Sequence, residues 1–143
     1  MIDLVLILQL ATTLPLVGLI AFVQVAHYPL FAEIDAACFG RYHERYVARV
    51  TTVVAPLMLV ELCAAMAWVV LARGSGDFAL SLVGLALVAV IWGSTHFLQV
   101  PCHRRLAESG PDRATLRRLV VTNAIRTVAW TGRAAIVLAA FSR

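Results

Sequence analysis

Residues 78–105 read FALSLVGLALVAVIWGSTHFLQVPCHRR, and this stretch decides the fold. It is almost entirely apolar as far as Trp92, which is long enough for an α-helix to cross the hydrocarbon core of a bilayer. Polar side chains enter only near its end. His96 and His103 are seven residues apart, so a continuous helix places them on one face, with Gln99 on the same side. Pro101 can bend this helix, because it removes a backbone donor and crowds the preceding turn. The stretch therefore predicts a transmembrane helix with a polar site at its far end.

The rest of the chain repeats this apolar pattern. Three further runs cover about 4–26, 47–72 and 119–140, and the 143 residues are 62% hydrophobic, only 14% charged, with a mean hydropathy of +0.88. Backbone polar groups in lipid must be paired within their own segment, which leaves helices for runs of this length. Short connections join the runs. The sequence predicts an all-α protein, an integral membrane four-helix antiparallel bundle that forms one domain over residues 1–143.

The connection between the first two runs is more than a plain loop. Leu30, Phe31, Ile34 and Cys38 recur at helical spacing. We expect either a short interfacial helix here or an early extension of the second helix. Either element would cover one mouth of the bundle.

The charge pattern predicts the orientation in the membrane. All basic residues are arginines, and most lie in the first and third connections: Arg41, Arg45, Arg49, Arg104, Arg105, Arg113, Arg117 and Arg118. The positive-inside rule places these connections in the cytoplasm and both termini outside, for a multi-pass protein of the inner (cytoplasmic) membrane. The net charge of +4 then reflects topology and contact with the lipid bilayer, with no nucleic acid partner. The three cysteines, an odd number in reducing or lipid surroundings, predict no disulfide framework.

All four histidines, His27, His43, His96 and His103, lie near the Arg-rich end of the predicted bundle. Imidazole is the commonest nitrogen ligand of protein-bound metals, so the cluster predicts a metal site for iron, copper or zinc, with haem as the alternative. Solvated interfacial histidines would give the same pattern. His27 and His96 are the stronger candidates, since both lie inside or at the edge of an apolar run. Tyr28, Tyr42 and Tyr46 are predicted for the aromatic belt.

Glu61 falls near the middle of the second run, where a carboxylate is costly unless it is paired or protonated. It can form a pair with Arg126 or Arg133 that fixes helix register. It can instead carry protons or act as a general base. The sequence leaves both interpretations open.

The fourth run carries Asn123 and Arg126 one turn apart. Together they can orient an anionic or carbonyl-bearing group, although Asn123 is better explained by an interhelical hydrogen bond. We predict contact with a bound cofactor for Gln99 and Trp130. No P-loop, G-x-G-x-x-G, G-x-S-x-G or C-x-x-C motif is present, which argues against nucleotide-driven, serine-hydrolase and thiol-redox chemistry.

Four short motifs resemble those of small bacterial four-helix membrane proteins and, more distantly, the anthrone-oxygenase-like family. They are Val25-Ala26-His27-Tyr28-Pro29, Arg41-Tyr42-His43, Val100-Pro101-Cys102-His103-Arg104-Arg105-Leu106, and Asn123-Ala124-Ile125-Arg126-Thr127 with Trp130. The layout extends over nearly the whole chain. The resemblance implies a membrane-bound oxygenase that acts on lipophilic, often polycyclic aromatic substrates and needs no obvious cofactor.

The function expected from these features is a membrane oxidoreductase, oxygenase-like, acting on a lipophilic small molecule at a histidine-rich metal or haem site. In this interpretation the four histidines supply metal ligands, Arg126 and Asn123 orient the substrate or stabilise developing negative charge, and Glu61 anchors Arg126 or relays protons. One alternative is a proton-coupled or metal-ion carrier, a homo-oligomer that uses Glu61 and Arg126. A second alternative is a non-catalytic structural subunit whose polar residues only lock helix packing.

Overall fold

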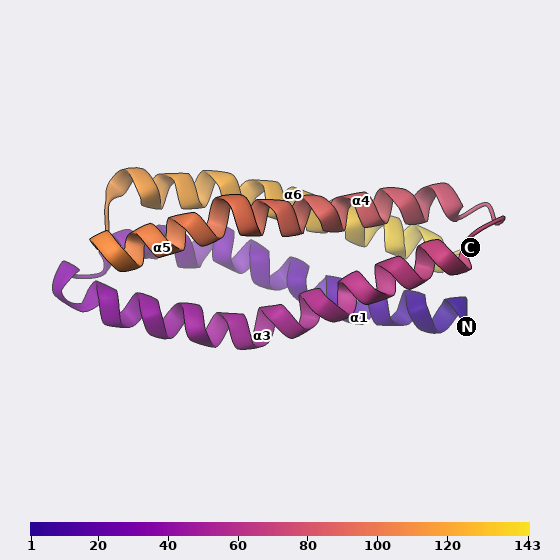
Figure 1. Ribbon diagram of the computed structural model, residues 1–143, viewed down its shortest axis with the longest axis horizontal. Helices are drawn as coiled ribbons and strands as arrows, with labels where there is room; N and C mark the ends of the chain where they lie inside the picture. The colour runs from indigo at the N-terminus through magenta and orange to yellow at the C-terminus, as the bar shows by residue number, and fades with distance from the viewer.

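The computed structural model describes all 143 residues and is a bundle of four long antiparallel helical rods (Figure 1). All four rods are long and apolar enough to cross a membrane, so the protein is a multi-pass membrane protein. The predicted all-α four-helix bundle is confirmed. The first rod comprises α1 (Ile2–Phe22), a π-helical segment (Val23–His27), α2 (Tyr28–Leu30) and a 3₁₀ turn (Phe31–Glu33), and the second rod is α3 (Ala36–Leu71). The third rod comprises α4 (Phe78–Ser94), a π-helical segment (Thr95–Gln99) and α5 (Val100–Ser109). The fourth rod is α6 (Arg113–Phe141).

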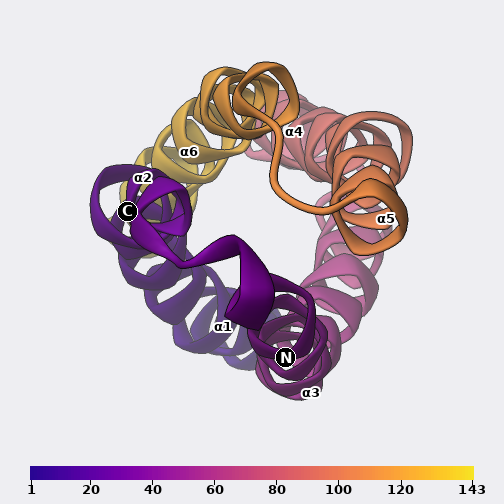
Figure 2. The same ribbon diagram turned by 90° about the vertical axis from the view of Figure 1, so that its left-hand side faces the viewer.

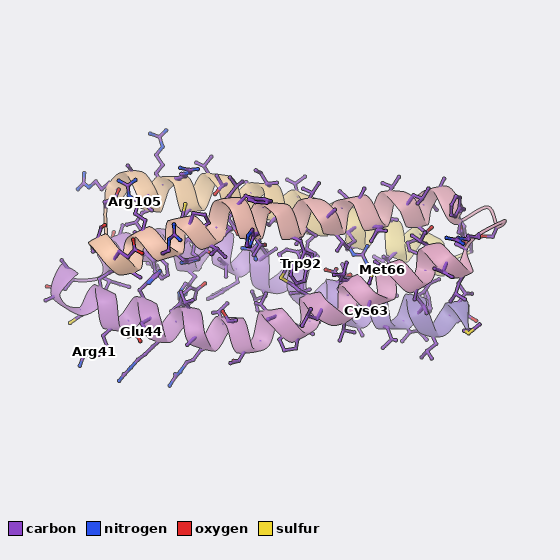
Figure 3. The ribbon with its side chains drawn as sticks, viewed as in Figure 1. Arg41, Glu44, Cys63, Met66, Trp92 and Arg105 are labelled. Atoms are coloured by element: carbon purple, nitrogen blue, oxygen red, sulfur yellow. The ribbon has the colours of Figure 1, made fainter.

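The rods follow one another around a ring when the bundle is viewed along its axis (Figure 2). Both termini lie at the end that also holds the turn between α3 and α4. The turns before α3 and before α6 lie at the opposite end. Arg41 and Glu44 of α3 and Arg105 of α5 mark this Arg-rich end (Figure 3).

Two aspartates explain why the helices at the Arg-rich end are longer than the apolar runs. The carboxylate of Asp35 accepts a hydrogen bond from the Ala37 backbone N–H at 2.8 Å and caps α3. Asp112 accepts one from the Thr115 N–H, also at 2.8 Å, and caps α6. Of the two structures expected for the first connection, the early extension of the second helix is therefore the one observed.

Each π-helical segment ends two residues before a proline, Pro29 in the first rod and Pro101 in the third. Proline has no N–H to donate and crowds the carbonyl group four residues earlier. A wider turn at this point accommodates both effects. Each such turn inserts about one extra residue, which rotates the side chains on its two sides by about 100° relative to a continuous helix. This rotation decides which polar residues of the third rod face inward.

Apolar side chains fill the bundle interior in three layers. The layer nearest the termini is built around Trp68 and Val137, the middle layer around Leu16 and Ile91, and the layer at the Arg-rich end around Phe39. All five side chains have no measurable exposure. These layers hold the rods in the arrangement that positions the polar groups.

A buried polar network ties all four rods together. Glu61 accepts hydrogen bonds from Thr13 Oγ1 at 2.6 Å, Trp130 Nε1 at 3.0 Å and Arg133 Nε at 2.9 Å. Arg133 also donates to the Gln9 side-chain oxygen at 2.6 Å. Glu61 and Arg133 are completely buried, so the pair is fixed on every side. The two ways of pairing Glu61 are thereby distinguished: its partner is Arg133, and Arg126 is not bonded to it.

Gly84 contributes to the same network through its backbone. Its carbonyl oxygen accepts a hydrogen bond from Arg133 Nη1 at 2.8 Å. A Cβ atom at Gly84 would lie 3.3 Å from both Arg133 Nη1 and Trp68 Cζ3, which is tighter than ordinary contact. Glycine at this position therefore leaves the space that the guanidinium group and the indole ring occupy.

Candidate functional site

A cavity of about 610 Å³ lies in the Arg-rich half of the bundle, between α3 and the third rod. This volume suits a small lipophilic molecule. Most of its wall is apolar, with side chains such as Leu19, Val54 and Met58. Polar groups interrupt this wall: Tyr28, His43, Tyr46, Trp92, Thr95, Gln99, His103 and Arg126 inside the bundle, with the exposed Glu44, Thr51 and Arg104 at its edge.

Arg126 is the principal charge on the cavity wall. Its side chain is only 7% exposed, and no carboxylate lies within 4 Å of it. Nη1 makes a long hydrogen bond of 3.4 Å to Asn123 Oδ1, and Nε has no partner. The guanidinium carbon lies 5.1 Å from the Trp130 ring centroid, a cation–π contact. A buried cation without a counter-charge is costly, so the site is electrostatically suited to an anion.

Asn123 holds Arg126 in place and does not line the cavity. Asn123 Nδ2 donates to Gln24 Oε1 at 2.8 Å, and Gln24 Nε2 donates to the Val120 carbonyl oxygen at 3.1 Å. This links α6 to the first rod. The interhelical hydrogen bond expected for Asn123 is present, and Asn123 positions Arg126.

Three side chains from three rods form a hydrogen-bonded chain beside the cavity. His43 Nε2 lies 3.0 Å from His103 Nδ1, and His103 Nε2 lies 3.1 Å from Tyr28 Oη. Two tautomer sets satisfy this chain. In the first set, His43 donates to His103 and His103 donates to Tyr28, so the unpartnered His43 Nδ1 can accept a proton. In the second set, Tyr28 donates to His103 and His103 donates to His43, so His43 Nδ1 carries a proton and is a donor. The chain can therefore move a proton between His43 Nδ1 and the Tyr28 hydroxyl group.

His27 and His96 do not join this chain. His27 stacks on Tyr46, with 4.2 Å between ring centroids, and packs edge-on against Phe31. His96 is exposed and contacts Phe97, which is itself 72% exposed. The prediction that His96 and His103 share a face is wrong, because the π-helical segment Thr95–Gln99 rotates His96 away from the interior.

The histidines are thus brought together only in part. His43 and His103 contact each other, but no three His, Cys, Asp or Glu side chains are grouped closely enough to hold one metal ion. The donor set therefore does not fit the four-histidine centre predicted from the sequence. Iron, copper, zinc or haem binding by this protein stays a prediction.

The two residues predicted to contact a cofactor have different positions. Gln99 lines the cavity; its Nε2 donates to Thr122 Oγ1 at 2.8 Å, and its buried Oε1 has no partner. Trp130 connects the two buried arginines, since its N–H donates to Glu61 while its ring lies against Arg126. Trp130 therefore supports the cavity from behind.

Sequence reasoning missed three cavity residues. Tyr28 and Tyr46 were expected in the aromatic belt, yet both line the cavity, with their hydroxyl groups near the Arg126 guanidinium group. Trp92 also lines it, and its buried indole N–H has no partner. The signal available for Tyr28 was its place between His27 and Pro29, at the end of an apolar run.

Comparison with known proteins gives no relative. No family model matches the chain, and no curated protein or solved structure matches it either.

The site's chemistry follows from its groups. Arg126 can stabilise a negatively charged oxygen, and the chain through His43 and His103 can accept a proton. The apolar wall holds the rest of a ligand and excludes water. These properties suit the deprotonation of a lipophilic compound whose conjugate base is an oxyanion.

Proposed function

We propose that the protein is an integral membrane oxidoreductase, oxygenase-like, that acts on a lipophilic small molecule carrying an acidic hydroxyl or an enolisable carbonyl group. The observation that carries the proposal is Arg126, a buried guanidinium group without a carboxylate partner on the wall of an apolar cavity. The resemblance of the motifs around His27, His43, His103 and Arg126 to the anthrone-oxygenase-like family supports the same reaction class.

The proposed step begins with loss of a proton from the substrate to His43 Nδ1. The resulting enolate or phenolate oxygen lies against Arg126, which stabilises its charge. The electron-rich substrate then reduces dioxygen. For a methylene substrate, one oxygen atom becomes the new carbonyl group and the other leaves as water, so R₂CH₂ and O₂ give R₂C=O and H₂O. His43 and His103 hold the proton in the meantime, and it returns to the oxygen atom that leaves as water.

We place the protein in the inner (cytoplasmic) membrane, with the Arg-rich end in the cytoplasm and both termini outside. The eight arginines of the first and third connections support this orientation. Both of these connections lie at one end of the bundle, and both termini lie at the other. The cavity is then nearer the cytoplasmic leaflet.

The test uses anthrone as probe, with the purified protein in phosphatidylcholine vesicles and an oxygen electrode. We expect one O₂ consumed per anthrone, above the rate in protein-free vesicles. Arg126→Gln and His103→Asn should each reduce this rate by about 10²-fold or more. Arg117→Gln, the same change at an exposed site on the same helix, is the matched control and should leave it unchanged.

Oxygen uptake no faster than in protein-free vesicles, across anthrone and other polycyclic hydroxyaromatic compounds, would contradict the proposal. Metal dependence has a separate test. Near-stoichiometric iron, copper or zinc in the purified protein, lost when His43 and His103 are both replaced by alanine, would add a metal to this site.

A further inference from the structure

The cavity reaches the outside of the bundle along one seam, between α3 and α5. Its lining includes exposed residues on both sides of this seam: Ala48 and Thr51 on α3, Val100 and Ala107 on α5. No connecting segment crosses the seam at this end, because the turns there join α2 to α3 and α5 to α6 (Figure 2). The opening therefore lies on the side of the bundle.

Small side chains explain why the seam is not filled. The cavity lining includes the small side chains Ala48, Thr51 and Ala55 on α3 and Ala107 on α5. Side chains of this size leave a gap between two helices where leucine or phenylalanine would close it. Deeper in the bundle the larger Met58 and Trp92 form the floor of the cavity. Trp92 lies near the middle of the bundle length (Figure 3).

The position of Arg126 and the apolar seam favour access from lipid. Arg126 is the only α6 residue of the lining, and it forms the back wall. At the Arg-rich end the lining includes the exposed Glu44, which has no cationic partner within 4 Å, whereas Arg104 is paired with Glu108 at 3.8 Å. On the seam itself the exposed side chain of Val100 is apolar, which suits contact with the acyl chains of lipid.

We propose that the seam between α3 and α5 is a lateral entry from the bilayer for an amphiphilic acid. Its carboxylate or phenolate group pairs with Arg126, and its apolar part lies between the two helices and extends into the lipid. The unpartnered N–H of Trp92 and the unpartnered Oε1 of Gln99 provide one donor and one acceptor for further polar groups of the ligand. This inference names the substrate class and its route, and it rests on the proposed function in using the same cavity.

The test uses 9,10-dibromostearate, a bilayer-dissolved carboxylate whose bromine atoms quench tryptophan on contact. The protein is placed in phosphatidylcholine vesicles, and the fluorescence of its three tryptophans, of which Trp92 lines the cavity and Trp130 lies against Arg126, is followed as the probe is added. We expect saturable quenching in the wild type. Thr51→Phe and Ala107→Phe, which fill the seam from opposite sides, should each weaken apparent binding by about tenfold or more. Val128→Phe is the matched control, because Val128 is 72% exposed on α6, away from the seam.

The outcomes separate this inference from the proposed function. Saturable quenching that is lost in Arg126→Gln but unchanged in both seam variants would overturn the lateral entry and leave the anion site in place. Quenching that is unchanged in Arg126→Gln would overturn the pairing with Arg126, and with it the basis of the proposed function. Absence of saturable quenching in the wild type would overturn entry of a bilayer-dissolved acid. Two seam variants are used so that misfolding of one does not decide the result.

Discussion

Arg126 and Arg133 lie on the same face of α6, two turns apart, and both are buried, yet they have opposite surroundings. Arg133 bonds to Glu61, Gln9 and the Gly84 carbonyl oxygen, so its donors are used and its charge is balanced. Arg126 has one long hydrogen bond, to Asn123, and no carboxylate. Arg133 therefore stabilises the fold, whereas Arg126 has donors and a charge free to bind a ligand.

Arg126 and Arg133 lie in different halves of the bundle, and the two halves differ in how their polar groups are paired. The half near the termini is closed in its charges, since Glu61 and Arg133 are each held by groups from several helices, although the neutral Gln9 Nε2 and Trp68 Nε1 there have no partner. The Arg-rich half has the cavity, in which unpartnered polar atoms of Arg126, Gln99, Trp92 and His43 occur together. Buried polar groups without partners reduce stability, and they are retained where a ligand supplies the missing partner. The difference that separates the halves is the pairing of charge: Arg133 has a carboxylate partner and Arg126 has none, which indicates the Arg-rich half as the one for function.

The largest expected effect is on the closed half. Glu61→Leu leaves the Arg133 charge buried and unpaired, and should lower the free energy of unfolding by about 3–5 kcal/mol. Thermal unfolding in detergent, followed by circular dichroism, measures the change. Replacing Glu61 and Arg133 together by leucine should restore much of the loss, because no unpaired charge then remains.

A carrier in which Glu61 moves protons makes a different prediction from this structural pairing. It requires Glu61 to exchange protons and leave Arg133 during transport. If Glu61→Leu left unfolding unchanged, the closed network would not be the stabilising element that its geometry indicates, and the contrast between the two arginines would fail.

The second prediction compares the two arginines directly. Arg133→Gln leaves Glu61 unpaired and should cost about 3–5 kcal/mol, whereas Arg126→Gln removes a charge that has no partner and should cost less than about 1 kcal/mol. For ligand binding, measured by the quenching assay, the order reverses, and Arg126→Gln has the larger effect. Equal losses of stability in the two variants would show that Arg126 has a partner within the protein.

The third prediction concerns the proton-accepting chain. His103→Asn removes the link between His43 and Tyr28, each of which then loses one hydrogen bond. We expect a loss of stability of about 1–2 kcal/mol together with a fall in oxygen uptake of about 10²-fold. Because Arg126 is unchanged, saturable binding of dibromostearate should persist. Loss of binding together with turnover would show that His103 shapes the cavity, which contradicts its role as part of a proton chain.

Sequence reasoning identified the rods and the residue types of the site, and missed how they meet. Runs of apolar residues fix four helices. The cost of burying Glu61 left pairing and protonation both open, and the structure shows the pair. The identity of that partner depends on the relative height of α3 and α6, which the sequence does not specify. His96 was misplaced because a π-helical turn before Pro101 shifts the periodicity, and no simple pattern distinguishes this proline from Pro15, which α1 accommodates without such a turn.

The smallest expected effect on stability is at Asp112, which lies outside the membrane-spanning segments. Its size can be compared with the three larger effects predicted above. Hydrogen bonds from the Thr115 side chain and backbone N–H hold the pKa of this carboxyl group below its usual value. A lowered pKa in the folded state means that the stabilisation is present above the unfolded-state pKa of about 3.9 and is lost as the pH falls through the folded-state pKa. Asp112→Ala should therefore lower the melting temperature at pH 7 by no more than about 4 °C, with the difference from wild type disappearing in acid. A difference as large as that of Glu61→Leu would show that the cap of α6 matters as much as the buried ion pair, and would weaken the contrast between the two halves of the bundle.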